Sequence, residues 1–167
     1  MRILILNGPN LNTLGSRLPA VYGTATLDSI LTALRERASA NAVELRDFQS
    51  NHEGALVDYI QAEAAAADGV VINPGALTHY GYSLRDALED CGKPAVEVHI
   101  SNIYRREPHR RHSIIAEVAR GQVAGLGWRG YLAAFDILVA LLRDEAATTS
   151  ATPPEGAATR KAGGSPV

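Results

Sequence analysis

A short strand near the middle of the chain carries two residues that can do acid–base chemistry. The segment Val-Glu-Val-His-Ile at residues 96–100 alternates apolar and ionisable side chains. On a β-strand this alternation puts Glu97 and His99 on one face, so a carboxylate and an imidazole leave the strand side by side. In an open α/β sheet, ligands bind at the carboxyl ends of the strands. A buried structural Glu–His pair would give the same pattern, so this pair alone does not decide the matter.

Polar residues also follow the other apolar strand patterns, at the points where those patterns end. They are Asn7 and Asn10 after the first, Asn51 and His52 after the second, and Asn73 after the third. A single asparagine in such a place is usually a turn former, because its side chain bonds its own backbone. The coincidence of all of them at one edge of a sheet favours a pocket for a small polar ligand.

Strand and helix patterns alternate along the chain and predict the scaffold that positions these residues. We expect strands over residues 2–7, 43–49, 69–73, 94–99 and 121–127, helices over 27–40, 56–67, 80–91 and 131–143, and a short helical segment within 108–119. Nearly continuous apolar strands that alternate with helices predict a parallel sheet covered on both faces. The expected fold class is α/β, a flavodoxin-like three-layer sandwich with a five-stranded parallel sheet.

Length and composition fit one compact domain. The chain has 167 residues, of which 46% are hydrophobic and 20% charged, enough for one core but not for two. We expect a single catalytic domain over residues 1–145. From residue 146 onward Ala, Thr, Ser, Pro and Gly dominate, which predicts a disordered C-terminal tail over 146–167. The net charge of −2 argues against a protein that binds nucleic acid by bulk electrostatics.

Cysteine content and hydropathy favour the cytoplasm. Cys91 is the one cysteine of the chain, so no intrachain disulfide can form and a reducing compartment fits. The apolar run at residues 3–6 is far shorter than the core of a signal peptide or a membrane-spanning helix. We therefore expect a cytoplasmic protein that does not act at a membrane.

Residues 125–130 satisfy the dinucleotide-binding pattern G-x-G-x-x-G, and Glu145 follows at a distance suited to a ribose contact. The pattern belongs to the last strand–helix unit, however, where no further strand exists to complete a βαβ unit. Tight packing of the helix on the strand is the favoured explanation of these glycines. A nucleotide- or phosphate-binding module without catalysis remains the alternative function.

The histidines and arginines after residue 104 allow two further interpretations. His109 and His112 have the helical spacing of metal ligands, but no Cys or carboxylate accompanies them in a zinc-type motif, so we expect no metal. The charged run over 105–112 is mostly solvated surface. One arginine that projects into the pocket could bind hydroxyls or a carboxylate through its guanidinium group.

Four separate blocks of the sequence resemble the type II 3-dehydroquinate dehydratases. The blocks are residues 5–23, 48–54, 73–80 with 84–88, and 97–102 with 110–113. The resemblance covers about residues 2–143 in order and leaves the tail out. One departure is Gly81, where relatives commonly carry Ser.

The resemblance implies the dehydration of 3-dehydroquinate to 3-dehydroshikimate by anti elimination through an enolate, in the shikimate pathway or in quinate catabolism. It implies no cofactor. The residues themselves argue against a Schiff base, because the lysines of the chain are Lys93, at the wrong end of a strand, and Lys161 in the tail.

The resemblance also assigns the base and the lid. Tyr22 matches the residue that removes the proton as a tyrosinate. A free phenol ionises only near pH 10, so this role needs a cation nearby, and Arg17 on the same loop is the candidate. We expect the loop over about residues 15–24 to close over the substrate and exclude water.

Other roles follow at the strand ends. His99 is the candidate general acid, because imidazole titrates near neutrality, and Glu97 would orient it or tune its pKa. Asn10 resembles the residue that holds a water against the developing enolate oxygen. The substrate-binding candidates are the backbone amides of Ile100 and Ser101 for the carboxylate, and the side chains of Asn73, His79 and Arg110 for hydroxyls and the carboxylate side, with Arg106 on the closing face.

The resemblance finally implies an assembly, in which trimers associate into a homododecamer. Asp86 matches an aspartate that reaches across a subunit boundary towards the neighbouring active site. There it could hold Arg17 by a charge-assisted hydrogen bond.

Overall fold

The structure, a computed structural model, describes residues 1–16 and 25–151 of the chain. Most of the predicted lid loop, including Arg17 and Tyr22, lies outside the described residues, and so do residues 152–167. Among the described residues, no helix is both long and apolar enough to cross a membrane.

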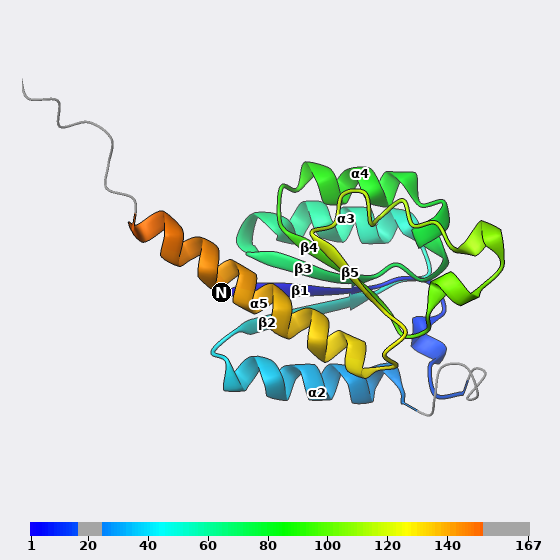
Figure 1. The fold of residues 1–167 in the computed structure, drawn as a ribbon, viewed down its shortest axis with the longest axis horizontal. Coiled ribbons are helices and arrows are strands. Elements are labelled where there is room, and N and C mark those ends of the chain that lie inside the picture. The colour runs from blue at the N-terminus through cyan, green and yellow to red at the C-terminus, as the bar shows by residue number, and fades with distance from the viewer. Residues whose placement is uncertain (17–24, 152–167) are drawn as a thin grey trace, which may run out of the picture.

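Five parallel strands form a single sheet in the described part of the chain (Figure 1). They are β1 (Arg2–Asn7), β2 (Glu44–Gln49), β3 (Gly69–Asn73), β4 (Ala95–His99) and β5 (Gly121–Ala124). The strand order is β2-β1-β3-β4-β5, which is the flavodoxin-like order. The predicted fold class is therefore confirmed.

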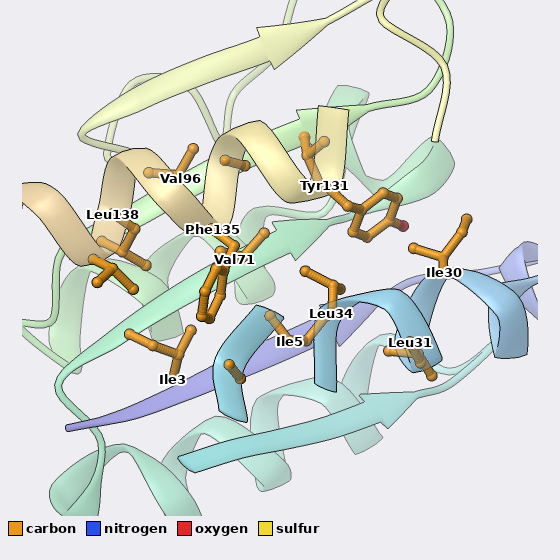
Figure 2. Close-up of a cluster of buried hydrophobic side chains, with 14 of the residues drawn as sticks. Ile3, Ile5, Ile30, Leu31, Leu34, Val71, Val96, Tyr131, Phe135 and Leu138 are labelled. Atoms are coloured by element: carbon orange, nitrogen blue, oxygen red, sulfur yellow. The ribbon is translucent and has the colours of Figure 1, made fainter. Parts of the chain in front are cut away.

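Helices cover both faces of the sheet (Figure 1). Helices α2 (Leu27–Ala40) and α5 (Arg129–Ala151) lie on one face, and α3 (Glu53–Glu63) and α4 (Tyr82–Asp90) on the other. Each face buries its own apolar cluster, because alternate residues of the strands point to opposite sides. Ile3, Ile5 and Val71 pack with α2 and α5 (Figure 2), whereas Leu4, Leu6 and Ile72 pack with α3 and α4.

Several predicted boundaries differ from the structure; α3, for example, runs over Glu53–Glu63 where the sequence predicts a helix over 56–67. The short helical segment predicted within 108–119 is present as one 3-10 helix, η5 (Pro108–Arg110). Strand β5 ends at Ala124, because Gly125 adopts a φ of 86° that no strand continues. Helix α5 runs on to Ala151, so the predicted start of the tail at residue 146 is too early. Alanines favour helix there, and the hydroxyls of Thr148 and Thr149 donate to carbonyl oxygens one turn earlier.

Candidate active site

A cavity of about 490 Å³ opens at the carboxyl ends of β1, β3 and β4. Among its lining residues are most of the candidates that the sequence predicted: Asn10, Asn73, His79, His99, Ile100, Ser101 and Arg110. Arg106 and His109 line it as well. The sheet topology thus brings side chains from distant parts of the chain to one place, as expected for the carboxyl edge of a parallel sheet.

His99 and Glu97 form a hydrogen-bonded pair at the cavity wall. Nε2 of His99 lies 2.8 Å from Oε1 of Glu97, and both side chains are buried. Because a carboxylate can only accept, Nε2 carries the proton and Nδ1 remains for the cavity. His99 lines the cavity, whereas Glu97 lies behind it.

Three further side chains hold the Glu97 carboxylate. The Thr78 hydroxyl donates to Oε1, and Ser113 Oγ and Gln122 Nε2 each donate to Oε2 at 2.8 Å. Burial pushes the pKa of Glu97 upward, but the hydrogen bonds from His99, Thr78 and Ser113 outweigh it, so the pKa lies below its ordinary value. Glu97 therefore stays ionised and keeps His99 in one orientation.

Thr78, Ser113 and Gln122 were not among the predicted site residues. Gln122 had a usable signal, since it is a polar residue in the middle of an expected strand, and its register partner is Glu97. Thr78 lies in the 3-10 helix η3 (Gly75–His79) and Ser113 in a loop, and the sequence does not tell which carboxylate such a hydroxyl will meet.

Asn10 is held in a left-handed backbone conformation with a φ of 67°, which asparagine tolerates better than most residues. Its backbone N–H donates to Oδ1 of Asn51 at 2.9 Å. The same oxygen accepts from Gln49 Nε2 at 3.1 Å. The end of β2 therefore fixes the position of Asn10 at the mouth of the cavity.

His79 is also held in a defined tautomer. Its Nδ1 is 2.8 Å from the carbonyl oxygen of His112, and a carbonyl only accepts, so Nδ1 carries the proton. In the neutral ring, Nε2 is then the hydrogen-bond acceptor available to a ligand.

The turn after β5 supports the end of β4. The N–H of Gly125 donates to the carbonyl oxygen of His99 at 3.2 Å, and that of Gly127 to the carbonyl of Ile100 at 2.9 Å. These amides are thus engaged in the fold, and a Cβ on Gly130 would lie within 3.5 Å of Val98 and Val123. The expected tight packing does not explain the G-x-G-x-x-G pattern, because the contacts of a Cβ on Gly130 would be ordinary van der Waals ones and a Cβ on Gly127 would meet nothing within 4 Å. Gly125 and Gly127 adopt φ angles of 86° and 61°, a left-handed conformation that glycine adopts without strain. The turn itself therefore accounts for these two glycines, and a nucleotide-binding module is not favoured.

Asp86 is not brought to this cavity within one chain. It lies on α4 with a side chain that is 63% exposed, and it pairs with Arg85 at 2.8 Å. Arg17 and Tyr22 lie outside the described residues, so the predicted base and its cation stay predictions.

Comparisons with known proteins identify the family to which this sequence is similar. Residues 1–139 match the family model described as dehydroquinase class II. A 3-dehydroquinate dehydratase of Roseiflexus castenholzii is 62% identical over 139 residues, which are 83% of this chain and 88% of that protein. One of Ralstonia nicotianae is 57% identical over 140 residues, covering 82% of this chain and 88% of that protein.

Solved structures give the same result. A type II dehydroquinase from Butyrivibrio crossotus superposes with a TM-score of 0.81 at 44% identity, covering 83% of this chain and 97% of that one. The type II dehydroquinase from Propionibacterium acnes gives 0.77 at 40% identity, with 83% and 96% covered. With sequence and fold in agreement, this chain belongs to the class II dehydroquinase family.

Proposed function

We propose that the cavity at the carboxyl ends of β1, β3 and β4 is where this chain dehydrates 3-dehydroquinate to 3-dehydroshikimate. The reaction is the one for which its relatives are named, and the chain is a hydro-lyase of this family. The observation that carries the assignment to this cavity is the His99–Glu97 pair, an imidazole at the wall whose inner nitrogen is held by a buried carboxylate and whose outer nitrogen has no hydrogen-bond partner among the described residues.

His99 acts as the general acid. Elimination breaks the bond between carbon and the leaving hydroxyl, and the departing oxygen needs a proton to leave as water. Protonated His99 gives that proton from Nδ1, while the Glu97 carboxylate balances the charge of the imidazolium and accepts from Nε2.

Substrate is held by groups around the same cavity. The amides of Ile100 and Ser101 bind its carboxylate, with Arg110 on that side, and no loop hydrogen bond in the described residues uses either amide as donor. Asn73 and His79 bind ring hydroxyls. Asn10 holds a water against the enolate oxygen, in the manner of an oxyanion hole.

Tyr22, as a tyrosinate stabilised by Arg17, removes the proton next to the ketone, and the electron pair of that C–H bond forms the enolate. Both residues belong to the loop that the resemblance assigns as a lid. We further propose that the chain acts in the cytoplasm, and that it assembles as trimers within a homododecamer.

The first test is turnover itself. The purified chain should convert 3-dehydroquinate with appearance of the enone absorbance of the product, without any added cofactor. Tyr22→Phe should lose turnover by several orders of magnitude and still bind substrate, because only the phenolate is removed. Turnover within tenfold of the wild type would contradict the role of Tyr22, whereas an inactive wild type would contradict the function.

A further inference from the structure

We propose that Tyr131 is a positioning residue for this active site, which fixes Asn73 as a hydrogen-bond donor to an oxygen atom of the ligand. Tyr131 lies on α5 and is fully buried. It does not line the cavity, but Asn73 does. Figure 2 shows the Tyr131 ring in the apolar cluster, with its hydroxyl oxygen directed towards the carboxyl ends of the strands.

The alternation of the strands explains why this hydroxyl meets two asparagines. Asn7 and Asn73 are register partners at the ends of β1 and β3. They point to the same face as Ile5 and Val71, the face covered by α5. Tyr131 Oη donates to Oδ1 of Asn7 at 2.7 Å and accepts from Nδ2 of Asn73 at 2.9 Å.

The sense of these hydrogen bonds is fixed from the Asn73 side. The N–H of Gly75 donates to Oδ1 of Asn73 at 3.1 Å, so the other side of the amide, Nδ2, must be the group that faces Tyr131. Tyr131 accepts there, and its own proton then goes to Oδ1 of Asn7. The reverse orientation of Asn7 would direct two N–H donors at one hydroxyl and leave the tyrosine proton without an acceptor.

One N–H of the Asn73 side-chain amide has no hydrogen-bond partner within residues 1–16 and 25–151. Nδ2 has two protons, one of which is used by Tyr131, and the second is available at the cavity. Burial raises the pKa of the Tyr131 hydroxyl more strongly than the Asn73 hydrogen bond lowers it, so the hydroxyl stays protonated and the network keeps its sense. Asn73 thus selects a ligand oxygen that accepts.

One polar atom of this hydrogen-bond network is buried without a partner among the described residues. Nδ2 of Asn7 is buried and has no hydrogen-bond partner among the described residues, which is unfavourable in a protein interior. A leucine-like residue at position 7 would avoid that cost, but it would remove the acceptor of the Tyr131 proton. The asparagine is therefore better explained by the orientation of Tyr131 and Asn73 than by packing.

The inference rests on the proposed function for its kinetic test. Tyr131→Phe removes only the hydroxyl and should raise KM for 3-dehydroquinate about fivefold, the factor that one typical hydrogen bond gives, with kcat changed much less. In an Asn73→Ala background, the same substitution should leave KM unchanged, because there is no amide left to orient. The matched control is Phe135→Leu, one turn further along α5 in the same cluster, which should lower the melting temperature without raising KM.

An unchanged KM in Tyr131→Phe, or an equal increase in the Asn73→Ala background, would overturn the proposal. If Tyr131→Phe does not fold, Asn7→Ala keeps the ring and removes its acceptor, and it should raise KM in the same way; an unchanged KM there would overturn the proposal too. Exchange of the Asn73 side-chain amide protons, measured by NMR, needs no turnover: it should be faster in Tyr131→Phe than in Phe135→Leu, and equal rates would contradict the positioning role even if the wild type proved inactive.

Discussion

At the scale of single residues, the outer nitrogen of His99 is the group on which the proposed chemistry depends. His99→Ala should lower kcat by about 10²–10⁴, the usual range for loss of a general acid. His52 is the matched control, because it also follows a strand end but is exposed and does not line the cavity. His52→Ala should keep kcat. Equal kcat for wild type and His99→Ala would show that the imidazole is structural.

The buried carboxylate of Glu97 makes the stability of the fold depend on pH. Its pKa in the folded protein lies below the ordinary value of 4.5, so its contribution is fully present above about pH 4.5. As the pH falls below that value, the unfolded chain takes up the proton first, and stability is lost until the folded pKa is reached.

Glu97→Gln tests this contribution. At pH 7 it should lower the free energy of unfolding by about 1–3 kcal/mol, because an amide replaces the charged acceptor of the buried network. Below pH 4.5 the free energy of unfolding of Glu97→Gln should fall less steeply with pH than that of the wild type. The two slopes should differ by at most about 1.4 kcal/mol per pH unit. Urea unfolding at a series of pH values measures both effects, and identical slopes in the two proteins would contradict the assignment.

At the scale of elements, the turn between β5 and α5 connects the fold to the site. Gly127 has a φ of 61°, and an added Cβ would meet nothing within 4 Å. Gly127→Ala should therefore lower the free energy of unfolding only by the backbone strain, about 1–2 kcal/mol. It should also raise KM, because a strained turn would shift the Gly127 amide, which holds the carbonyl of Ile100 in the site.

Gly92 offers a closely matched control for that strain. It has a φ of 63° with equally open surroundings, and it lies just after α4, where its N–H donates to Glu89. Gly92→Ala should lose a similar free energy of unfolding with an unchanged KM. Equal kinetic effects in both variants would mean that the turn has no special link to the site.

The same scale shows what the sequence could and could not predict. The strands β1, β3 and β4 were predictable because their β-branched, nearly continuous apolar runs are typical of buried parallel strands. The extent of the short helix within 108–119 was not, because a contact distant in the sequence decides the path of the chain there: the Ile114 N–H donates to the carbonyl of Thr78.

In the site, too, local sequence patterns predicted some contacts and missed others. Alternation along β4 was enough to pair Glu97 with His99, because it depends on two positions in one strand. The hydroxyls of Thr78 and Ser113 reach Glu97 from 19 and 16 residues away in the chain, and the role of Tyr131 depends on a contact 124 residues away. Such contacts follow from the packing of whole elements, which a local pattern does not contain.

At the scale of the whole molecule, Asp86 is the residue that the proposed assembly explains better than the single chain does. Its partner Arg85 also pairs with Glu89 at 2.9 Å, so Arg85 would keep an acidic partner if Asp86 were removed. An exposed pair of this kind contributes about 0–1 kcal/mol. A role in the trimer, where Asp86 would reach the neighbouring subunit near Arg17, is the alternative.

Asp86→Ala should therefore lower kcat/KM and weaken the trimer together, because both depend on the same carboxylate at the subunit boundary. Glu89→Ala is the control, since Glu89 is similarly exposed, at 57%, and pairs with the same Arg85; it should change neither property. Sedimentation velocity at several protein concentrations, with activity measured on the same samples, separates the two cases. A wild-type protein that sediments as a fully active monomer would contradict the role of Asp86, because no neighbouring subunit would be present for it to reach.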